Sequence, residues 1–212
     1  MKLIDYTVRE FVKDLDSAKP APGGGSASAL GAAMGMALSR MVGHLTIPKK
    51  KFKALDDEVQ DLFIEIHEAM KDSERRALEL IDEDTEAFNA IMKAFKMPKE
   101  SEEEKQARKA AIEKATYKAT EVPLEIGRLA HGVLSKIAHI SKYGNKHAIS
   151  DVGVSALLLH AALEGAILNV RINLPGISDS GYVQRIEEEI ADMETTGKRL
   201  KEDVLNIVND KL

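Results

Sequence analysis

The 212-residue chain contains no cysteine and no tryptophan, and only 4% of its residues are aromatic. The lack of cysteine excludes a thiolate nucleophile, a cysteine-based zinc site and a disulfide framework, and it is compatible with the reducing cytoplasm. The net charge is only −5, and the one basic run is Lys49–Lys51. This run predicts a solvated turn or, alternatively, a contact with an anionic tail. We expect a cytoplasmic protein that has no nucleic-acid partner.

Targeting signals and membrane segments are the next question. The N-terminal residues are charged and show no signal peptide. Residues 26–47 are apolar, with Gly31 and Gly35 in a spacing that is common in membrane helices. However, Arg40 and His44 interrupt the segment, and its apolar residues are mostly alanine and glycine. It therefore predicts a close-packed soluble helix, and we expect no membrane partner.

Helix-forming residues dominate the composition. A capping box at Thr7–Glu10 precedes the first of several helical patterns, and no segment has the pattern of a strand. Pro123 is expected to break or kink the fourth helix. The chain predicts an all-α bundle of long antiparallel helices in one domain spanning 1–212. The expected helices cover about 7–17, the glycines to Thr46, Leu55–Phe95, 101–142, 150–173 and 179–208.

Three consecutive glycines, Gly23, Gly24 and Gly25, stand between a Pro-x-Pro entry and a helix of small residues that begins near Ser26. Glycine allows another group to approach the backbone closely. The start of a helix offers unpaired N–H groups and partial positive charge, which suit a carboxylate, a phosphate or the polar edge of a heterocycle. The alternative is a simple tight turn between two helices.

Two aspartates fall on the long helix that follows. Asp84 lies on its apolar stripe, where a carboxylate must be paired, hydrogen-bonded or facing a cavity. Asp82 is about 200° away around the helix, so the two cannot both point into one pocket. We favour Asp84 as the functional carboxylate. The alternative is that Asp84 pairs with a buried arginine or lysine.

Polar residues also mark both ends of the helix predicted over 150–173. Ser150 and Asp151 stand at its start, which predicts an N-cap and an ionised Asp151 that is a better charge partner than base. Asn169 and Asn173 are four residues apart on one face. Their amides suit the edge of a pterin or an amide. The alternative is that they join buried helices.

Metal and nucleotide motifs are missing. None of the six histidines has a metal-ligand spacing with another histidine and a carboxylate. There is no Walker motif, and Gly23–Gly25 lacks the strand–turn–helix context of a dinucleotide fold. We therefore expect no metal site, and packing or surface roles for the histidines.

Four segments, taken in order, are similar to the folate cyclodeaminase/cyclohydrolase family. That family includes the cyclodeaminase part of formiminotransferase-cyclodeaminase and bacterial methenyltetrahydrofolate cyclohydrolases. The resemblance covers nearly the whole chain. It rests on Pro20-Ala21-Pro22-Gly23-Gly24-Gly25-Ser26 with Met41-Val42 and Leu45-Thr46, Asp82-Glu83-Asp84-Thr85-Glu86-Ala87-Phe88, Gly144-Asn145 with Ser150-Asp151, and Asn169-Val170-Arg171-Ile172-Asn173-Leu174 with Ile177-Ser178-Asp179.

The resemblance implies a homodimer that acts on a tetrahydrofolate derivative and uses no metal, nucleotide or redox cofactor. The implied reaction is hydrolysis of 5,10-methenyltetrahydrofolate to the 10-formyl compound, or cyclisation of 5-formiminotetrahydrofolate with release of ammonia. We favour the hydrolysis because this chain carries no formiminotransferase segment. A non-catalytic folate-binding helical dimer is the alternative of another class.

The same resemblance assigns roles to residues. Three acidic side chains are the expected catalytic groups, with charge-stabilising and proton-transfer roles: Asp151, Asp84 and Asp82. The glycine turn and its serine supply backbone donors, and asparagines hold the pterin or amide edge. The expected substrate-binding residues are Gly23, Gly24, Gly25, Ser26, Asn145, Ser150, Asn169 and Asn173.

Overall fold

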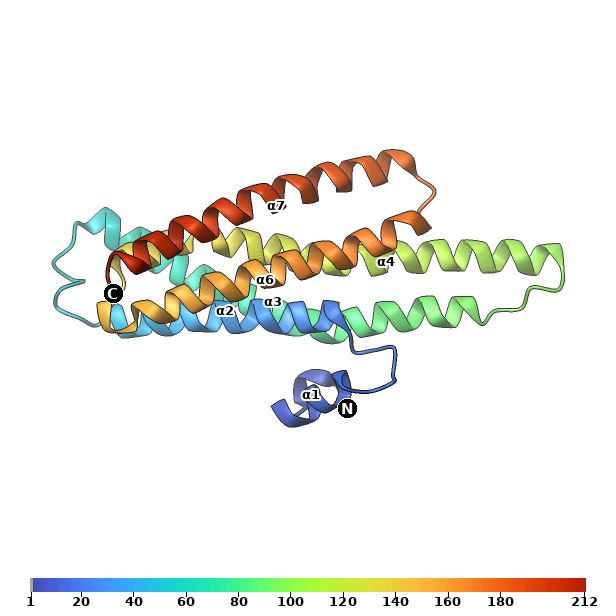
Figure 1. Cartoon of the computed structure of the whole chain (residues 1–212), viewed down its shortest axis with the longest axis horizontal. Coiled ribbons are helices and arrows are strands. Elements are labelled where there is room, and N and C mark those ends of the chain that lie inside the picture. The colour runs from blue at the N-terminus through green and yellow to red at the C-terminus, as the bar shows by residue number, and fades with distance from the viewer. Residues whose placement is uncertain (1) are drawn as a thin grey trace.

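The computed structural model describes residues 2–212, and over that range the chain is helical with no strand. The all-α prediction is thus confirmed. Figure 1 shows α2, α3, α4, α6 and α7 running side by side, with α1 set apart below them. The helices are α1 (Val8–Leu15), α2 (Gly24–Thr46), α3 (Asp57–Phe95), α4 (Glu102–Leu134), α5 (Ile137–Tyr143), α6 (Ile149–Asn173) and α7 (Ser180–Asn209), with short 3-10 turns η1 (Leu3–Asp5), η2 (Lys146–Ala148) and η3 (Leu174–Gly176).

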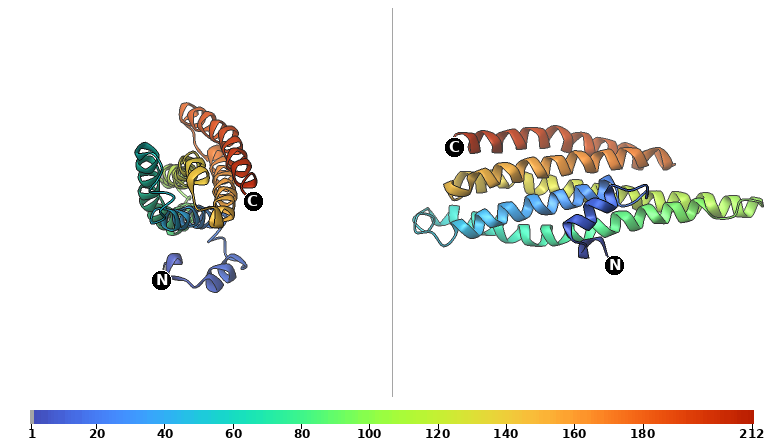
Figure 2. Two further views of the ribbon diagram at one scale, coloured as in Figure 1. Left: turned by 90° about the vertical axis from the view of Figure 1, so that its left-hand side faces the viewer. Right: turned by 60° about the horizontal axis from the view of Figure 1, so that its bottom comes forward.

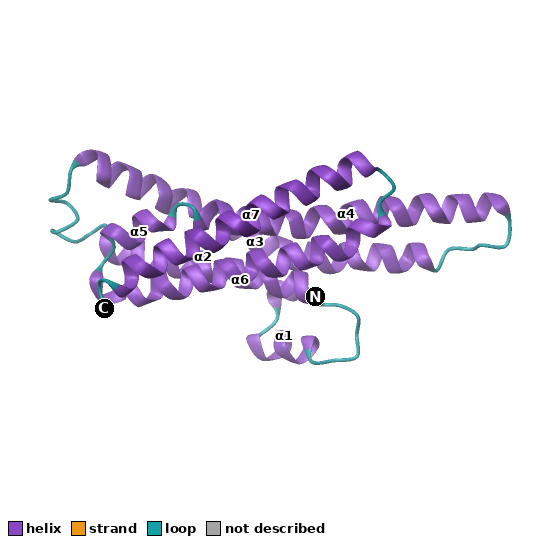
Figure 3. Ribbon diagram, turned by 45° about the horizontal axis from the view of Figure 1, so that its top comes forward, coloured by secondary structure: helices purple, strands orange, loops and turns teal. Residues whose placement is uncertain are grey.

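Most of the predicted helix boundaries agree with the structure. The Thr7 capping box is present, since Thr7 accepts from the Glu10 backbone and Glu10 accepts from the Thr7 backbone. Figure 3 shows the α2–α3 and α3–α4 connections at opposite ends of the bundle, whereas the connection after α1 lies below its middle. In the end-on view of Figure 2, α3 and α7 lie on opposite sides of the bundle, with the yellow segment around α5 between them.

The predicted N-cap at Ser150 is wrong. The helix α6 begins one residue earlier, at Ile149, and the capping position is Ala148, which makes no side-chain cap. The turn η2 leads directly into α6, and the side chain of Asn145 caps that turn by accepting from His147 N. Ser150 and Asp151 therefore lie inside the first turn of α6. The partial positive charge of that turn still favours a carboxylate there.

Of the two effects expected of Pro123, a break or a kink, the break does not occur, because α4 continues through the proline to Leu134. A proline inside a helix has no N–H to give to the carbonyl four residues earlier. Here that carbonyl belongs to Ala119, and it accepts a hydrogen bond from Asn173 Nδ2 at 2.7 Å. A side chain of α6 thus supplies the donor that Pro123 lacks, so α4 continues without an unpaired buried carbonyl.

The closest packing in the bundle joins α2 to α6, which run antiparallel. A Cβ on Gly35 would lie 2.9 Å from Leu159 Cγ and 3.1 Å from the Ser155 carbonyl oxygen, so only glycine fits there without a shift. Two fully buried hydroxyls cross the same contact, since Ser155 donates to the Gly35 carbonyl at 2.6 Å and Ser39 lies 2.8 Å from Ser155 Oγ. Small residues therefore let the two backbones approach each other.

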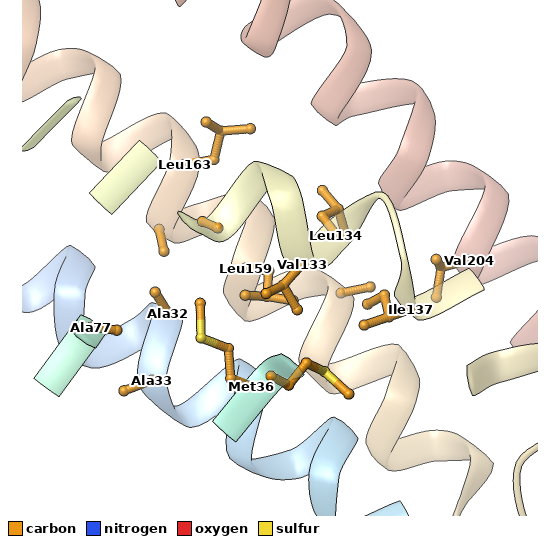
Figure 4. Close-up of a cluster of buried hydrophobic side chains, with 14 of the residues drawn as sticks. Ala32, Ala33, Met36, Ala77, Val133, Leu134, Ile137, Leu159, Leu163 and Val204 are labelled. Carbon is orange, nitrogen blue, oxygen red and sulfur yellow. The ribbon is translucent and has the colours of Figure 1, made fainter. Parts of the chain in front are cut away.

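A shared hydrophobic core fills the space between these helices and the rest of the bundle. Figure 4 shows its side chains converging from α2, α4, α5, α6 and α7; they include Met36, Val133, Leu134, Ile137, Leu159 and Val204. The segment Lys146–Gly176, which contains α6, is the one described helix long and apolar enough to cross a membrane by length and composition, and half of its apolar window is buried in this bundle.

A double-mutant cycle tests the link between Pro123 and Asn173. In the wild-type background, Asn173→Ala should lower the free energy of unfolding by about 1–3 kcal/mol, because the Ala119 carbonyl loses its donor. In a Pro123→Ala background the new N–H bonds to that carbonyl, so the cost of Asn173→Ala should fall by about 1 kcal/mol or more. Urea denaturation followed by circular dichroism measures both values.

The matched control for this cycle is Asn169→Ala. The side chain of Asn169 donates to the Gly165 carbonyl, which lies in an unbroken part of α6. Its coupling with Pro123→Ala should be close to zero. If Asn173→Ala and Pro123→Ala were additive as well, the proposed compensation would be refuted.

Candidate functional site

Three consecutive acidic residues of α3 point in three different directions. Asp82 accepts from the backbone N–H groups of Leu3 at 2.6 Å and Ile4 at 3.4 Å, so it holds the N-terminal turn against the bundle. Glu83 is paired with Arg76. Asp84 alone turns toward the start of α2. The structure therefore separates Asp82 from Asp84, as the angular spacing of the two residues predicts.

Asp84 is held by Ser26 in the first turn of α2. Its Oδ2 accepts from Ser26 N at 2.8 Å and from Ser26 Oγ at 3.1 Å. Ser26 is fully buried, and its hydroxyl can donate to Asp84 or to the Ile81 carbonyl at 2.8 Å. The same hydroxyl lies 3.2 Å from Thr85 Oγ1, and either of these two oxygens can be the donor. The carboxylate thus replaces a missing helical partner for an N-terminal N–H of α2. It is not the partner of a buried arginine or lysine.

Opposing effects act on the proton affinity of Asp84. Burial raises the pKa of its carboxyl above the ordinary value, and the two hydrogen bonds from Ser26 lower the pKa by a smaller amount. The side chain is half-buried and so keeps some contact with solvent. A carboxyl whose pKa is raised in this way is a candidate for proton transfer.

The glycine turn makes room for this carboxyl group. A Cβ on Gly25 would lie 2.0 Å from Asp84 Oδ1, so no other residue fits there unless Asp84 moves. A Cβ on Gly24 would lie 3.1 Å from Asn169 Nδ2, whereas one on Gly23 would meet nothing within 4 Å. Gly24 and Gly25 thus allow a carboxylate and an amide to approach the same turn, which is more than a simple connection between helices requires.

Asn169 and Asn173 on α6 differ in how many of their side-chain N–H groups are already hydrogen-bonded. Asn173 Nδ2 donates to the carbonyls of Ala119 and Asn169, at 2.7 and 2.9 Å, so both of its N–H groups are used inside the bundle. Asn169 donates once, to the Gly165 carbonyl, and lies against Gly24. The reading of Asn173 as a link between helices fits the structure. Asn169 faces the glycine turn.

The remaining predicted residues lie at the opposite end of α2. Asn145 N donates to Thr46 Oγ1 at 2.9 Å, and its side chain lies near the Leu45 carbonyl. Because α2 rises about 33 Å between Gly24 and Thr46, one chain cannot bring both sets of residues into one pocket. We call Gly23–Ser26, Asp84, Asn169 and Asn173 the glycine-end group, and Asn145, Ser150 and Asp151 the loop-end group.

Asp151 is the acidic member of the loop-end group. It is half-buried in the first turn of α6. Among residues 2–212, it forms no ion pair and its side chain forms no hydrogen bond. This contrasts with Asp84, whose carboxylate is held by two donors.

Two features of these ends were not predicted from the sequence. Thr85 joins the hydrogen bonds around Ser26, and its position directly after Asp84 is the only signal that points to it. The loop-end group borders a pocket of about 600 Å³ that is lined by Asn145 and by lysines from three separate segments. The basic run Lys49–Lys51 is the only feature of the sequence that points to this pocket. No group of three or more His, Asp or Glu able to hold a metal ion occurs in the described part of the chain.

Comparison with known proteins gives a consistent result. The formiminotransferase-cyclodeaminase family matches residues 7–192. A methenyltetrahydrofolate cyclohydrolase from Methylorubrum extorquens is 36% identical over 206 residues, which are 97% of each chain. A formimidoyltransferase-cyclodeaminase from Sus scrofa is 33% identical over 90% of this chain, which spans only 35% of that protein. The crystal structure of a formiminotetrahydrofolate cyclodeaminase from Thermotoga maritima superposes with a TM-score of 0.84 at 29% identity, over 97% of each chain.

Asp84→Asn tests the effect of burial on Asp84. Because the pKa of Asp84 is raised in the folded protein, its carboxyl stays protonated at pH values where the same group in the unfolded chain has lost its proton. The contribution of Asp84 to the free energy of unfolding therefore falls as pH rises above the pKa of Asp84 in the unfolded chain, and it stays reduced at neutral pH. We expect Asp84→Asn to have a higher Tm than wild type at pH 7 and an equal Tm near pH 3, measured by calorimetry.

Asp82→Ala is the control for this measurement. It removes the acceptor of the Leu3 N–H and should lower the free energy of unfolding by about 1–3 kcal/mol. An Asp84→Asn protein that lost stability at pH 7 to the same extent would contradict the assignment of Asp84 as a carboxyl held at a cost to stability.

Proposed function

The chain belongs to the formiminotransferase-cyclodeaminase family, and from this premise we propose that it is a folate enzyme hydrolysing 5,10-methenyltetrahydrofolate to 10-formyltetrahydrofolate. The observation that carries the proposal is the half-buried Asp84 with its raised pKa beside a glycine turn. The cyclohydrolase from Methylorubrum extorquens, which matches this chain from end to end, supports the choice of reaction. We expect a cytoplasmic enzyme that needs no metal, nucleotide or redox cofactor.

The reaction needs a proton acceptor and then a proton donor. Water adds to the carbon that bridges N5 and N10 in the cationic substrate and gives a tetrahedral carbon. The bond from this carbon to N5 then breaks, N5 gains a proton, and the formyl group stays on N10 with net release of one proton. As a carboxylate, Asp84 would stabilise the cation and accept the proton of water. As a carboxylic acid it would return that proton to N5.

Neighbouring groups would hold the substrate for this step. The open turn at Gly23 and Gly24 offers N–H groups at a helix start, and the free faces of the Asn169 amide suit a pterin edge. Asn173 would act indirectly, because its N–H groups are used within the bundle. Ser26 would keep Asp84 in place, and Asp82 would have no part in the chemistry.

Cyclodeamination is the second candidate. The protein from Thermotoga maritima with the same fold is named a formiminotetrahydrofolate cyclodeaminase. In that reaction N10 attacks the formimino carbon, the same kind of tetrahedral carbon forms, and ammonia leaves. One carboxyl group that accepts and donates a proton would serve either route. The two routes differ in whether ammonia is released, which an assay can follow.

We further propose that the protein is a homodimer joined through the outer face of α2 and α6. Adjacent stripes of exposed apolar side chains cover this face, and among them are Met34, Met41, Leu45, Val154, Leu157, Leu168 and Ile172. The α2 stripe has no carboxylate between Gly24 and Thr46. A large apolar patch of this kind favours association with a second copy through the same surface.

A two-fold axis through the middle of this face would also unite the two predicted groups. If the axis is perpendicular to α2 and α6, it places the loop end of the partner against the glycine end of the first protomer. Each site would then combine Asp84 and Asn169 of one chain with the partner's Asp151, Ser150 and Asn145. This arrangement would explain why the glycine-end group and the loop-end group lie about 33 Å apart in a single chain.

The first test follows the methenyltetrahydrofolate chromophore with the purified protein in two cuvettes. We expect faster decay of the chromophore when the reaction starts from 5,10-methenyltetrahydrofolate. Starting from 5-formiminotetrahydrofolate, appearance of the chromophore with ammonia would identify a cyclodeaminase instead. Silence in both cuvettes from folded protein that still binds folate would refute the enzyme and support the non-catalytic binding module.

The second test is complementation between two inactive variants. Asp84→Asn and Asp151→Asn should each lower kcat by about a hundredfold or more. When equal amounts are unfolded and refolded together, half of the dimers are mixed and each has one intact site, so activity should return to about a quarter of wild type.

A matched control makes this test specific. Mixing Asp84→Asn with Asp82→Asn should also restore activity, but Asp82→Asn alone should already be active. If mixtures of Asp84→Asn and Asp151→Asn stay inactive, the proposal that each site is shared between two chains is refuted. A fully active Asp151→Asn protein would remove Asp151 from the site.

A further inference from the structure

The loop end of the bundle holds an unusual concentration of positive charge. The pocket of about 600 Å³ between Thr46 and the C-terminus is lined by Lys49, Lys51, Lys142, Lys146 and Lys211, and none of its described lining residues is acidic. These lysines come from the loop after α2, from α5 and the turn η2, and from the end of the chain. Five lysines around one pocket stand out in a chain whose net charge is −5.

Carboxylates do not neutralise this charge. Within the described residues, none of the five lysines forms an ion pair with an aspartate or glutamate, although lysines elsewhere in the chain do. Lys142 lies over the ring of Tyr143, with Nζ 5.2 Å from its centroid. Positive groups held together without counter-charges repel one another, so they favour the binding of an anion.

Lys211 is the most fixed of the five. Its Nζ donates to the carbonyls of Ser141 and Lys142, at 2.7 and 2.5 Å, in the last turn of α5. A cation there complements the negative end of a helix. Burial lowers the pKa of Lys211, and the nearby charge of Lys51 lowers it further. A bound anion would relieve that repulsion.

The pocket also has an apolar side. Phe52 is buried beneath it, Leu55 and Tyr143 are half-buried, and all three line the cavity. A concave pocket of this volume with apolar walls and a few charged groups is typical of small-molecule sites. A flat basic patch of the kind that meets nucleic acid would lack both features.

We infer that this lysine pocket binds a small polyanion that carries several carboxylate or phosphate groups next to an apolar portion. Two sources share this chemistry. One is the glutamate chain of the substrate, and that reading rests on the proposed function. The other is a free polyphosphate ligand. The inference itself concerns binding, so it is tested without turnover and can fail independently of the reaction.

The experiment is calorimetric titration of the full chain with two probes, a γ-linked triglutamate peptide and inorganic tripolyphosphate. We expect at least one probe to bind, with an affinity that falls as salt is added. The double variant Lys49→Gln/Lys51→Gln should weaken that binding by about tenfold or more, because each lysine offers a charged donor. Preference for the peptide would assign the pocket to the substrate, and preference for tripolyphosphate would assign it to a free phosphate ligand.

The control is Lys50→Gln/Lys53→Gln, which makes the same change in net charge in the same loop. Both lysines are exposed and neither lines the pocket. Binding should stay within about twofold of wild type, as expected for surface charges, and circular dichroism should show that both variants are folded. The inference is overturned if neither probe binds to the wild-type protein, or if the control weakens binding as much as the pocket variant.

Discussion

The close antiparallel contact between α2 and α6 is the constraint on which the rest of this structure depends. Glycine and serine at Gly35, Ser39 and Ser155 bring the two backbones together, and the buried hydroxyls satisfy each other and a backbone carbonyl. The contact fixes which residues meet at each end. Gly24 faces Asn169 at one end, and the residues after Thr46 meet the loop at Asn145 at the other. It also leaves the outer face of both helices apolar and exposed.

At the glycine end, the fold holds a carboxyl group at a cost to stability. The first turn of α2 needs acceptors for its free N–H groups, and Asp84 supplies one at Ser26. Burial still outweighs these bonds and raises the pKa of the carboxyl. A group used only to cap the helix would gain from being fully ionised. At Asp84, burial instead raises the pKa, and Gly25 leaves space for the carboxyl group and for no side chain of its own. Both features suit a proton-transfer residue.

Much of this architecture could be predicted from the sequence, because helical periodicity, caps and prolines are local signals. The angular separation of Asp82 from Asp84 followed from helix geometry alone. Pro123 shows where local reasoning fails. Its missing N–H is replaced by the side chain of Asn173 on α6, which donates to the Ala119 carbonyl 54 positions earlier in the chain, so only the tertiary structure reveals why the helix continues. The lysine pocket escaped prediction for the same reason, since its members come from three separate segments.

The two ends of the α2–α6 pair differ in electrostatic character, and this difference bears on how a substrate would lie. The glycine end presents a carboxyl group, which suits a cationic one-carbon unit. The loop end presents unpaired lysines, which suit the anionic part of the same molecule. In one chain these ends are too far apart for one small ligand. A two-fold axis across the apolar face would set the carboxyl end of one chain beside the lysine end of the other. The shared apolar face, the half-buried Asp151 without a side-chain partner and the separated charges then have one common explanation, which is a site completed by the second copy.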